Sequence, residues 1–362
     1  MLVIFCSAVL LDCNNGNEPD AKVEPTNLVI VETISSDGSG LVTFVASAEN
    51  AVKYQFYFGE DALAGAFNSV DGKASYGYQN TGSYNVKVIA YSVDEVAINK
   101  TIFITIQVNE PTFSNDGYTT PLDYAGMTLV WQDEFNGSEL NPAYWTHETG
   151  NNNGWGNHEL EYYQAENTLI YDGHLVIKAK KENVGGFQYT SSRMVTQGKK
   201  EFKYGRVDIR AILPKGQGLW PALWMLGSDI STVGWPKCGE IDIMEMIGGG
   251  DGRDNKVYGT PHWDNGQHAS YGGNTMLSEG KIFADEFHVF SIVWDAEKIV
   301  WYLDDVQYHI IDIRPTELDE FQKEFFFIFN VAVGGDWPGN PNETTLFPQR
   351  MIVDYIRMFQ PI

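Results

Sequence analysis

The residues of this chain best suited to chemistry lie between positions 240 and 245, which read Glu-Ile-Asp-Ile-Met-Glu. Acidic and apolar residues alternate through the first four positions, which is the period of a strand with one face in a core and one face open. Strict alternation would bury Glu245, and an unpaired buried carboxylate is costly. An extra residue near Met244, as in a β-bulge, returns Glu245 to the face that carries Glu240 and Asp242.

Among three carboxylates on one strand face, one can act as an acid and another as a base. Like charges at this spacing raise one another's pKa, so one carboxyl stays protonated near neutral pH while another is ionised. Hydrolysis of a glycosidic bond needs such a pair, a carboxylic acid and a carboxylate that flank the bond. The pattern Glu-x-Asp-x-x-Glu also arises by chance in an acidic protein, so its neighbours must decide between the two interpretations.

Aromatic residues lie on both sides of this acidic segment. Trp220, Trp224 and Trp235 precede it, and Trp263 follows it in the run Gly-Thr-Pro-His-Trp. Trp side chains pack against the flat C–H faces of sugar rings, and their amphipathic rings suit a wet cleft. Core packing explains any one of them equally well, but it is a poor explanation for all four. The pattern therefore predicts a carbohydrate-binding cleft.

The motifs WPALWM, GEIDIMEM and GTPHW, with VDYIRMFQ near the end of the chain, resemble those of glycoside hydrolase family 16. The likeness covers residues 127 to 362 and is strongest to laminarinase-type bacterial endo-β-glucanases. It implies a β-jelly-roll with a long open cleft and a retaining, double-displacement mechanism. By position, Glu240 would be the nucleophile, Glu245 the acid/base, and Asp242 the residue that tunes and orients the pair. The spacing of the two glutamates permits retention, but that assignment rests on the resemblance.

The resemblance also implies substrate contacts outside the acidic strand. His262 would lie beside the acid/base and hydrogen-bond a hydroxyl or the leaving group, with a core histidine as the alternative. Arg193 would contact glucan through its fork of donors, with a surface ion pair as the alternative. The family usually has Asn and Gln where this chain has His158 and Glu161, and Asn where it has Asp336. The residues predicted to bind substrate are Asn157, Glu159, Arg193, Trp220, Trp224, Trp235, His262 and Trp337.

A structural calcium ion is a further implication of the resemblance. In the family, calcium often ties the first and last strands together, and the matching positions are Glu134, Gly173 and Asp354. Backbone and carboxylate oxygens are ligands that calcium accepts, although ordinary surface acids explain both carboxylates equally well. No cofactor is expected for catalysis itself, since the chain shows no redox motif and no phosphate-binding loop.

The first residues, MLVIFCSAVLLDCNNGNEPD, are typical of a targeting segment. The apolar run from Leu2 to Leu11 is too short to span a bilayer and has the length of a signal-peptide core. Cys13 follows it, as in a bacterial lipoprotein signal, where it would carry the lipid; a plain secretory signal is the alternative. The resemblance implies an outer-membrane lipoprotein of a Gram-negative bacterium, at the cell surface or in the periplasm. With only two further cysteines, Cys6 and Cys238, no disulfide framework is expected.

The composition excludes several classes of partner. A formal net charge of -24 over 362 residues argues against nucleic-acid binding, which needs basic patches. It also argues against polyanionic substrates such as heavily sulfated galactans, whereas a neutral polysaccharide tolerates it. We therefore expect a polysaccharide substrate, no nucleic acid, contact with a membrane only through a lipid anchor, and a monomeric protein.

The fold is predicted to be all-β. All ten Trp lie after residue 130, which marks a change of module. Short alternating runs over 25–110 predict a small immunoglobulin-like sandwich, in which the stretch YGYQNTGSYNVKV resembles a PKD-type (polycystic-kidney-disease) domain. The remaining chain is almost entirely strand-like and predicts a jelly-roll sandwich. The predicted parts are a signal or lipoprotein segment with linker (1–24), the PKD-like domain (25–110), a Pro/Gly/Asx-rich linker (111–126) and the catalytic domain (127–362).

Three functions remain open at this point. The first is an endo-β-1,3-glucanase, acting on laminarin with or without mixed-linkage β-1,3/1,4-glucan. The second is an endo-β-galactanase acting on galactose-containing glycans such as mucin O-glycans, because relatives with the same bulged motif cleave those. The third is a non-catalytic surface glycan-binding protein on the same fold, against which the presence of both Glu240 and Glu245 argues. Linkage specificity depends on loops, so the sequence separates the first two poorly.

Overall fold

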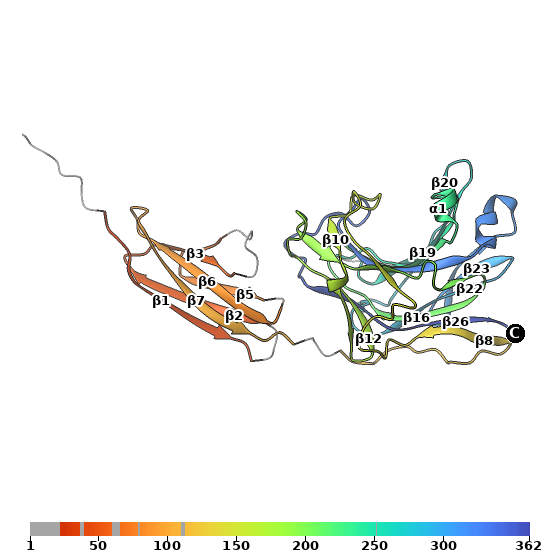
Figure 1. Ribbon diagram of the computed structural model, residues 1–362, viewed down its shortest axis with the longest axis horizontal. Coiled ribbons are helices and arrows are strands. Elements are labelled where there is room, and N and C mark those ends of the chain that lie inside the picture. The colour runs from red at the N-terminus through yellow and green to blue at the C-terminus, as the bar shows by residue number, and fades with distance from the viewer. Residues whose placement is uncertain (1–21, 37–39, 60–65, 79, 110–112, 251) are drawn as a thin grey trace, which may run out of the picture. The chain divides into compact units, whose positions relative to one another are not determined.

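The structure is a computed structural model that describes residues 22–362 apart from 37–39, 60–65, 79, 110–112 and 251 (Figure 1). The predicted lipidation site, Cys13, lies outside the described residues. The chain divides into two compact units, Met1–Pro111 and Thr112–Ile362. Within the described ranges, no helix has both the length and the apolar character needed to cross a membrane.

Unit 1 is a sandwich of two antiparallel sheets, which confirms the predicted immunoglobulin-like architecture. Alternate residues point inward: Val42, Phe44 and Ala46 on one sheet and Val86 and Val88 on the other are buried in a common core. One sheet contains β1 (Thr26–Ile34), β2 (Leu41–Glu49) and β5 (Lys73–Gly77), and the other contains β4 (Phe67–Ser69), β3 (Lys53–Tyr57), β6 (Gly82–Tyr91) and β7 (Ala97–Ile106).

Unit 2 is the predicted β-jelly-roll, built from two larger sheets. The outer sheet runs β11-β12-β26-β16-β22-β23-β24, with β8 beside β26. Its strands are β8 (Met127–Asp133), β11 (Thr168–Tyr171), β12 (His174–Ala179), β16 (Gly205–Ile212), β22 (His288–Trp294), β23 (Lys298–Leu303), β24 (Val306–Asp312) and β26 (Gln349–Pro361).

The second sheet of unit 2, which we call the cleft sheet, runs β20-β19-β18-β17-β25-β14-β9, with β15 beside β25 and β21 beside β19. A short parallel pair, β10 (Glu161–Tyr163) and β13 (Tyr189–Ser191), lies outside both sheets. The cleft-sheet strands are β9 (Thr146–Glu148), β14 (Arg193–Val195), β15 (Glu201–Phe202), β17 (Leu219–Gly227), β18 (Glu240–Glu245), β19 (Lys256–Asp264), β20 (His268–Ser270), β21 (Gly273–Met276) and β25 (Phe325–Val333).

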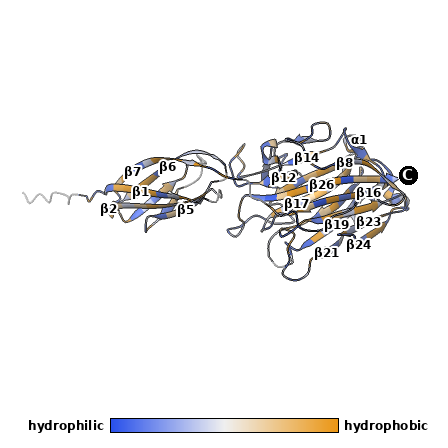
Figure 2. Cartoon of the chain, turned by 90° about the horizontal axis from the view of Figure 1, so that it is seen from below, coloured by the Kyte–Doolittle hydropathy of each residue, from blue (hydrophilic) through white to orange (hydrophobic). Residues whose placement is uncertain are grey.

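The main core of unit 2 fills the space between these sheets. It joins Val207 and Ile209 of the outer sheet to Leu223, Met225 and Phe327 of the cleft sheet, and apolar residues follow the strands throughout (Figure 2). Strand β25 is buried along its whole length, as its run FFFIFNVAV predicts. Helical structure is limited to α1 (Ile230–Val233), η1 (Ala165–Asn167) and η2 (Thr316–Gln322) among the described residues, the last near the helical patch expected from Pro315.

The segment 113–124, which we call the strap, lies within the linker predicted at 111–126 and contacts the outer sheet. Arg210 of β16 donates from Nε to the carbonyl oxygen of Tyr118 (2.7 Å) and from its terminal nitrogen to that of Asn115 (2.6 Å). The hydroxyl of Tyr355 accepts the backbone N–H of Thr120 at 2.9 Å. Phe113 packs edge-on against the ring of His174, 4.8 Å between centroids. The strap is therefore bound to the outer sheet as part of unit 2.

Candidate active site

Strand β18 carries the three carboxylates on one face because it contains a β-bulge. Opposite β17, Met244 pairs with Leu223 and Asp242 pairs with Trp224, so Ile243 is the extra residue. The bulge lies within one residue of the predicted position, and Ile243 and Met244 are both buried in the core. Glu240, Asp242 and Glu245 thus line one cavity together.

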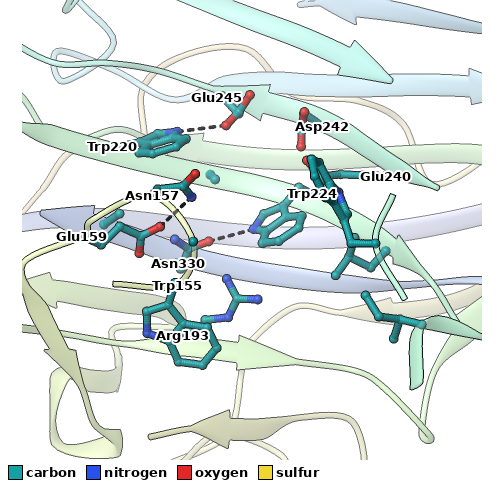
Figure 3. Close-up of a pocket in the computed structure, with 16 residues that line it drawn as sticks. Trp155, Asn157, Glu159, Arg193, Trp220, Trp224, Glu240, Asp242, Glu245 and Asn330 are labelled. Carbon is teal, nitrogen blue, oxygen red and sulfur yellow. Dashed lines mark hydrogen bonds between the residues drawn. The ribbon is translucent and has the colours of Figure 1, made fainter. Parts of the chain in front are cut away.

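Each glutamate has its own indole donor. Trp220 Nε1 donates to Oε1 of Glu245 at 2.9 Å, and Trp235 Nε1 donates to Oε2 of Glu240 at 3.0 Å. These tryptophans therefore bind carboxylates as well as offering rings to a ligand. The stick view shows the indole of Trp220 directed at Glu245, with Asp242 and Glu240 further along the same strand (Figure 3).

Burial raises the pKa of all three acids. For Glu240 it raises the pKa to about 8, assisted by the charge of Asp242 and opposed by His262 and by the Trp235 hydrogen bond. For Asp242 it raises the pKa to about 8, while a hydrogen bond with Glu245 lowers it. That same hydrogen bond raises the pKa of Glu245 further, well above its usual value. The hydrogen bond between the two side chains thus favours the ionised form of Asp242 and the protonated form of Glu245.

His262 lies at the centre of the carboxylate group. Its Nε2 is 3.0 Å from Oδ2 of Asp242 and 3.7 Å from Oε1 of Glu240. Its Nδ1 is 2.7 Å from Nε2 of His268 on β20, whose ring stacks on that of His262 with 5.0 Å between centroids. His262 was predicted beside the acid/base, Glu245; its close carboxyl contacts are with Asp242 and Glu240, and its side chain is partly buried rather than part of the core. His268 was not predicted, and no feature of the sequence marks it.

The carboxylates line a cavity of about 310 Å³ on the cleft sheet (Figure 3). Tryptophan side chains and acids share its walls, as a sugar-binding cleft requires. The predicted residues that line it are Asn157, Glu159, Arg193, Trp220, Trp224, Trp235, Glu240, Asp242 and Glu245. The further lining residues, none of them predicted, are Trp155, Gly156, Ala222, Leu226, Ile230, Asn330 and Ala332.

The remaining predicted aromatics lie beside this cavity rather than in its lining. Trp337 is partly exposed and meets Trp220 edge-on at 5.4 Å and Tyr258 at 5.0 Å. It therefore extends the aromatic surface beyond the acids. Trp263 instead packs against the core and lies edge-on to Phe321 at 6.4 Å. The core-packing alternative is the one observed for Trp263.

Arg193 combines the two alternatives considered for it. Its Nε donates to Oε2 of Glu148, and its guanidinium lies between the rings of Trp155 (4.5 Å) and Trp224 (4.9 Å). A cation held between two aromatic faces fixes both rings. Arg193 thus faces the cavity and also positions the tryptophans that line it.

Two lining residues that sequence reasoning missed had visible signals. Asn330 is the single polar residue in the apolar run of β25, and its Oδ1 accepts from Trp224 Nε1 at 2.8 Å. A lone polar residue in a buried strand must find partners, which marks it as a site candidate. Trp155 lies between two glycines in a loop of Asn and Gly, a setting that favours function over packing.

The side chains of the predicted calcium ligands are largely engaged in ion pairs. Both carboxylate oxygens of Glu134 accept from Arg357 (2.7 and 2.8 Å), and Oδ2 of Asp354 accepts from Arg210 at 2.7 Å. Oδ1 of Asp354 in turn lies 3.5 Å from Nε2 of His174. The side chains thus fit calcium poorly.

In the described ranges, one group of His and acidic side chains, Glu240, Asp242 and His262, brings a ligand atom each within 4.8 Å of the others. These are the groups that hydrolysis needs, and the proposed reaction uses no metal ion.

Comparison with known proteins places the site in a family. The family model for glycosyl hydrolases family 16 matches residues 154–357, over half of the chain and the whole of β18. This chain belongs to that family. The family 16 domain here is therefore a glycoside hydrolase domain, and the resemblance read from its motifs is confirmed.

Three relatives define the likeness further. A glucan endo-1,3-beta-glucosidase A1 from Niallia circulans is 40% identical over 67% of this chain, and a clotting factor G alpha subunit from Tachypleus tridentatus is 38% identical over 64%. The laminarinase catalytic domain from Thermotoga maritima matches 65% of the chain and 99% of that structure, at 49% identity and a TM-score of 0.61. The chain spans only 39% and 34% of the length of the first two.

Proposed function

We propose that this family 16 domain is a retaining endo-β-1,3-glucanase that acts on laminarin-type glucan, with mixed-linkage β-1,3/1,4-glucan as a second substrate. The observation that carries the proposal is the bulged strand β18, which presents Glu240 and Glu245 to one aromatic cavity. The likeness to the laminarinase domain, complete over that structure's length, supports the choice of substrate.

The reaction would proceed in two displacements. In the first, the Glu240 carboxylate attacks the anomeric carbon while Glu245 gives its proton to the glycosidic oxygen, so the C–O bond breaks and one glucan fragment leaves. In the second, Glu245 takes a proton from water, whose oxygen displaces Glu240 from the anomeric carbon. The sugar is released with its original β configuration, and both glutamates return to their starting state.

The surrounding residues would assign the two roles. Trp235 donates a hydrogen bond to Glu240, and His262 lies beside it, so both favour the ionised form that a nucleophile needs. Asp242 holds the proton on Glu245 in the resting site. As Glu240 loses its charge to the sugar and Glu245 gains one, the hydrogen bond from Trp220 would stabilise the new carboxylate.

The walls of the cavity favour a neutral polymer. Trp155, Trp220, Trp224 and Trp235 offer several rings for stacking, which is consistent with several sugar subsites. The formal net charge of -24 disfavours sulfated chains electrostatically. An internal cleavage pattern follows if the cleft is open at both ends, as the family resemblance implies.

A panel of purified polysaccharides tests the proposal. Laminarin, mixed-linkage glucan, cellulose and poly-N-acetyllactosamine-type glycans are each incubated with the protein, and products are sized over time. Mid-length oligosaccharides should appear early from laminarin, and none from cellulose. Activity confined to the galactose-containing glycans would instead establish an endo-β-galactanase. Binding of laminarin without any cleavage would establish a glycan-binding protein.

We further propose that Cys13 carries a lipid that tethers the protein to the outer membrane of a Gram-negative bacterium, with unit 1 as the spacer. The support is the sequence of the first 20 residues, in which Cys13 follows an apolar run. Stable attachment needs more than one acyl chain. Cys13→Ala should move the protein from the membrane to the soluble fraction, and unchanged partitioning would rule the anchor out.

Calcium at Glu134, Gly173 and Asp354 stays a secondary prediction. Its support is the family resemblance alone, because both carboxylates already have basic partners. The unfolding temperature should be higher with calcium than with a chelator. Equal values would rule out a stabilising site.

A further inference from the structure

Two buried carboxyls, Glu159 and Glu161, interact with each other, and Glu159 also lines the cavity. Glu161 is fully buried and Glu159 is 7% exposed. Oε2 of Glu161 accepts the backbone N–H of Val333 on β25 at 2.6 Å. Its Oε1 has no donor anywhere in the described ranges, and the side chain with which it interacts is the carboxyl of Glu159. Because a buried oxygen needs a hydrogen-bond partner, a proton is expected between Oε1 of Glu161 and the carboxyl of Glu159.

The groups around this pair supply no full positive charge to it. Glu159 accepts from the hydroxyl of Tyr163 (Oε2, 3.0 Å) and from the amide of Asn157 (Oε1, 3.0 Å). Arg193 of β14 is the cation on this side, but its Nε binds Glu148 and its guanidinium lies between two tryptophans. From β25, Glu161 receives only the backbone donor of Val333. Two ionised carboxylates side by side in this setting would be strongly disfavoured.

We propose that Glu159 and Glu161 share one proton, and that Glu161 is a positioning residue which donates from Oε1 to Glu159 and so holds the cavity in its binding form. This inference rests on the proposed function, since the role it assigns is in glycan binding. Burial and the charge of Glu159 both raise the pKa of Glu161 well above its usual value, in agreement with the geometry.

A chain of hydrogen bonds connects the pair to a sugar-binding surface. Tyr163 donates to Glu159 and accepts from the amide of Asn330 at 3.0 Å, and the other end of that amide accepts from Trp224 at 2.8 Å. Figure 3 marks two of these hydrogen bonds, the one between Asn157 and Glu159 and the one between Asn330 and Trp224. The orientation of Trp224 therefore depends on the position of Glu159.

Loss of the shared proton would weaken glycan binding and leave the rate of bond cleavage unchanged. At alkaline pH the two carboxylates repel each other, Glu159 moves, and the hydrogen bonds to Asn157 and Tyr163 lengthen. Because these residues bind glycan and do not transfer protons to it, the effect falls on KM. The decline of kcat at alkaline pH has a separate cause, the ionisation of Glu245.

The test is the pH dependence of KM and kcat on laminarin for the native protein, Glu161→Gln and the control Glu166→Gln. In Glu161→Gln the new side-chain amide can donate to Glu159 and accept from Val333, so it reproduces the protonated acid without titrating. The native KM should rise about fivefold at alkaline pH, the equivalent of one lost hydrogen bond. Glu161→Gln should keep KM flat with an unchanged kcat profile, and the exposed control should follow the native protein.

A flat native KM would overturn the proposal, as would a Glu161→Gln variant whose KM rises like the native one. The native series decides even if the variant does not fold. Thermal unfolding against pH provides a readout that needs no substrate. Because the pKa of Glu161 is raised in the folded state, its contribution to stability is full below the ordinary pKa of Glu and is lost as pH rises. The native unfolding temperature should therefore fall more steeply at alkaline pH than that of Glu161→Gln, even if no glucan is cleaved; parallel curves would contradict the shared proton.

Discussion

Glu240 and Glu245 lie on the same face of β18 but differ in their hydrogen-bond partners. Each glutamate receives an indole N–H, Glu240 from Trp235 and Glu245 from Trp220, and Glu245 also has a hydrogen bond with Asp242. The indole N–H and His262 favour the carboxylate form of both glutamates, whereas the hydrogen bond with Asp242 favours the carboxylic acid form of Glu245. This asymmetry, rather than the spacing of the acids, distinguishes the nucleophile from the proton donor.

Substitution of either glutamate should therefore remove catalysis and spare binding. Glu240→Gln and Glu245→Gln should each lower kcat on laminarin by roughly 10² to 10⁴-fold, because the amide can neither attack nor transfer a proton. Binding measured by calorimetry should persist, since the tryptophans are untouched. Asp242→Asn should have a smaller effect. Glu166→Gln is the matched control on an exposed acid, and near-native turnover by both active-site variants would disprove the assignment.

The same substitutions should stabilise the protein at alkaline pH. Burial raises the pKa of Glu240 to about 8 and that of Glu245 well above 4.5, so the contribution of each acid to stability is full below about pH 4.5 and is lost as the pH rises. At pH 8 to 9 the Gln variants should unfold at a higher temperature than the native protein, and at pH 4 the difference should vanish. A difference of the opposite sign, measured by calorimetry across this range, would contradict the burial of these charges.

The sequence identified the site residues that lie close together in motifs, but not those that come from distant strands of the folded sheet. The three acids and Trp220, Trp224 and Trp235 stand close together in the chain, so their types and spacing identify them. Asn330 and His268 come from β25 and β20, and only the order of strands in the sheet brings them to β18. The proton shared by Glu159 and Glu161 could not be predicted either, because it depends on which neighbours each carboxyl lacks.

At the level of elements, the alternation of apolar and polar residues predicted most of the strands. The bulge in β18 followed from the cost of burying Glu245, and the full burial of β25 followed from its apolar run. The contacts of the strap could not be predicted, because its composition is that of a loop. Its attachment comes from its own carbonyl oxygens, which bind Arg210 of the outer sheet, and composition does not report backbone acceptors.

The strap should contribute measurably to the stability of unit 2. A chain that begins at Thr112 keeps every strap contact, whereas one that begins at Met127 leaves the buried guanidinium of Arg210 without three of its acceptors, the carbonyl oxygens of Asn115, Asp116 and Tyr118. Removal of partners from a buried charge costs about 3 kcal/mol or more. The shorter chain should therefore unfold at a clearly lower temperature, while the longer one should keep full activity on soluble glucan. Equal unfolding temperatures would show that the strap is dispensable.

At the scale of the whole molecule, the chain combines a tryptophan-free sandwich with an acidic hydrolase domain. All ten Trp lie in unit 2, so the glycan-stacking surface belongs to that unit. The likeness of unit 1 to a PKD-type domain stays a prediction. Each unit has a main hydrophobic core of its own, which accounts for two folded bodies on one chain.

The configuration of the first-formed product tests the central claim most directly. Proton NMR of laminarin digested by the protein resolves the two anomers of each new reducing end before they interconvert. A double displacement through Glu240 predicts that the β anomer appears first and that the α anomer grows in only by mutarotation. Initial release of the α anomer would contradict the assignment of Glu240 as nucleophile and Glu245 as acid/base.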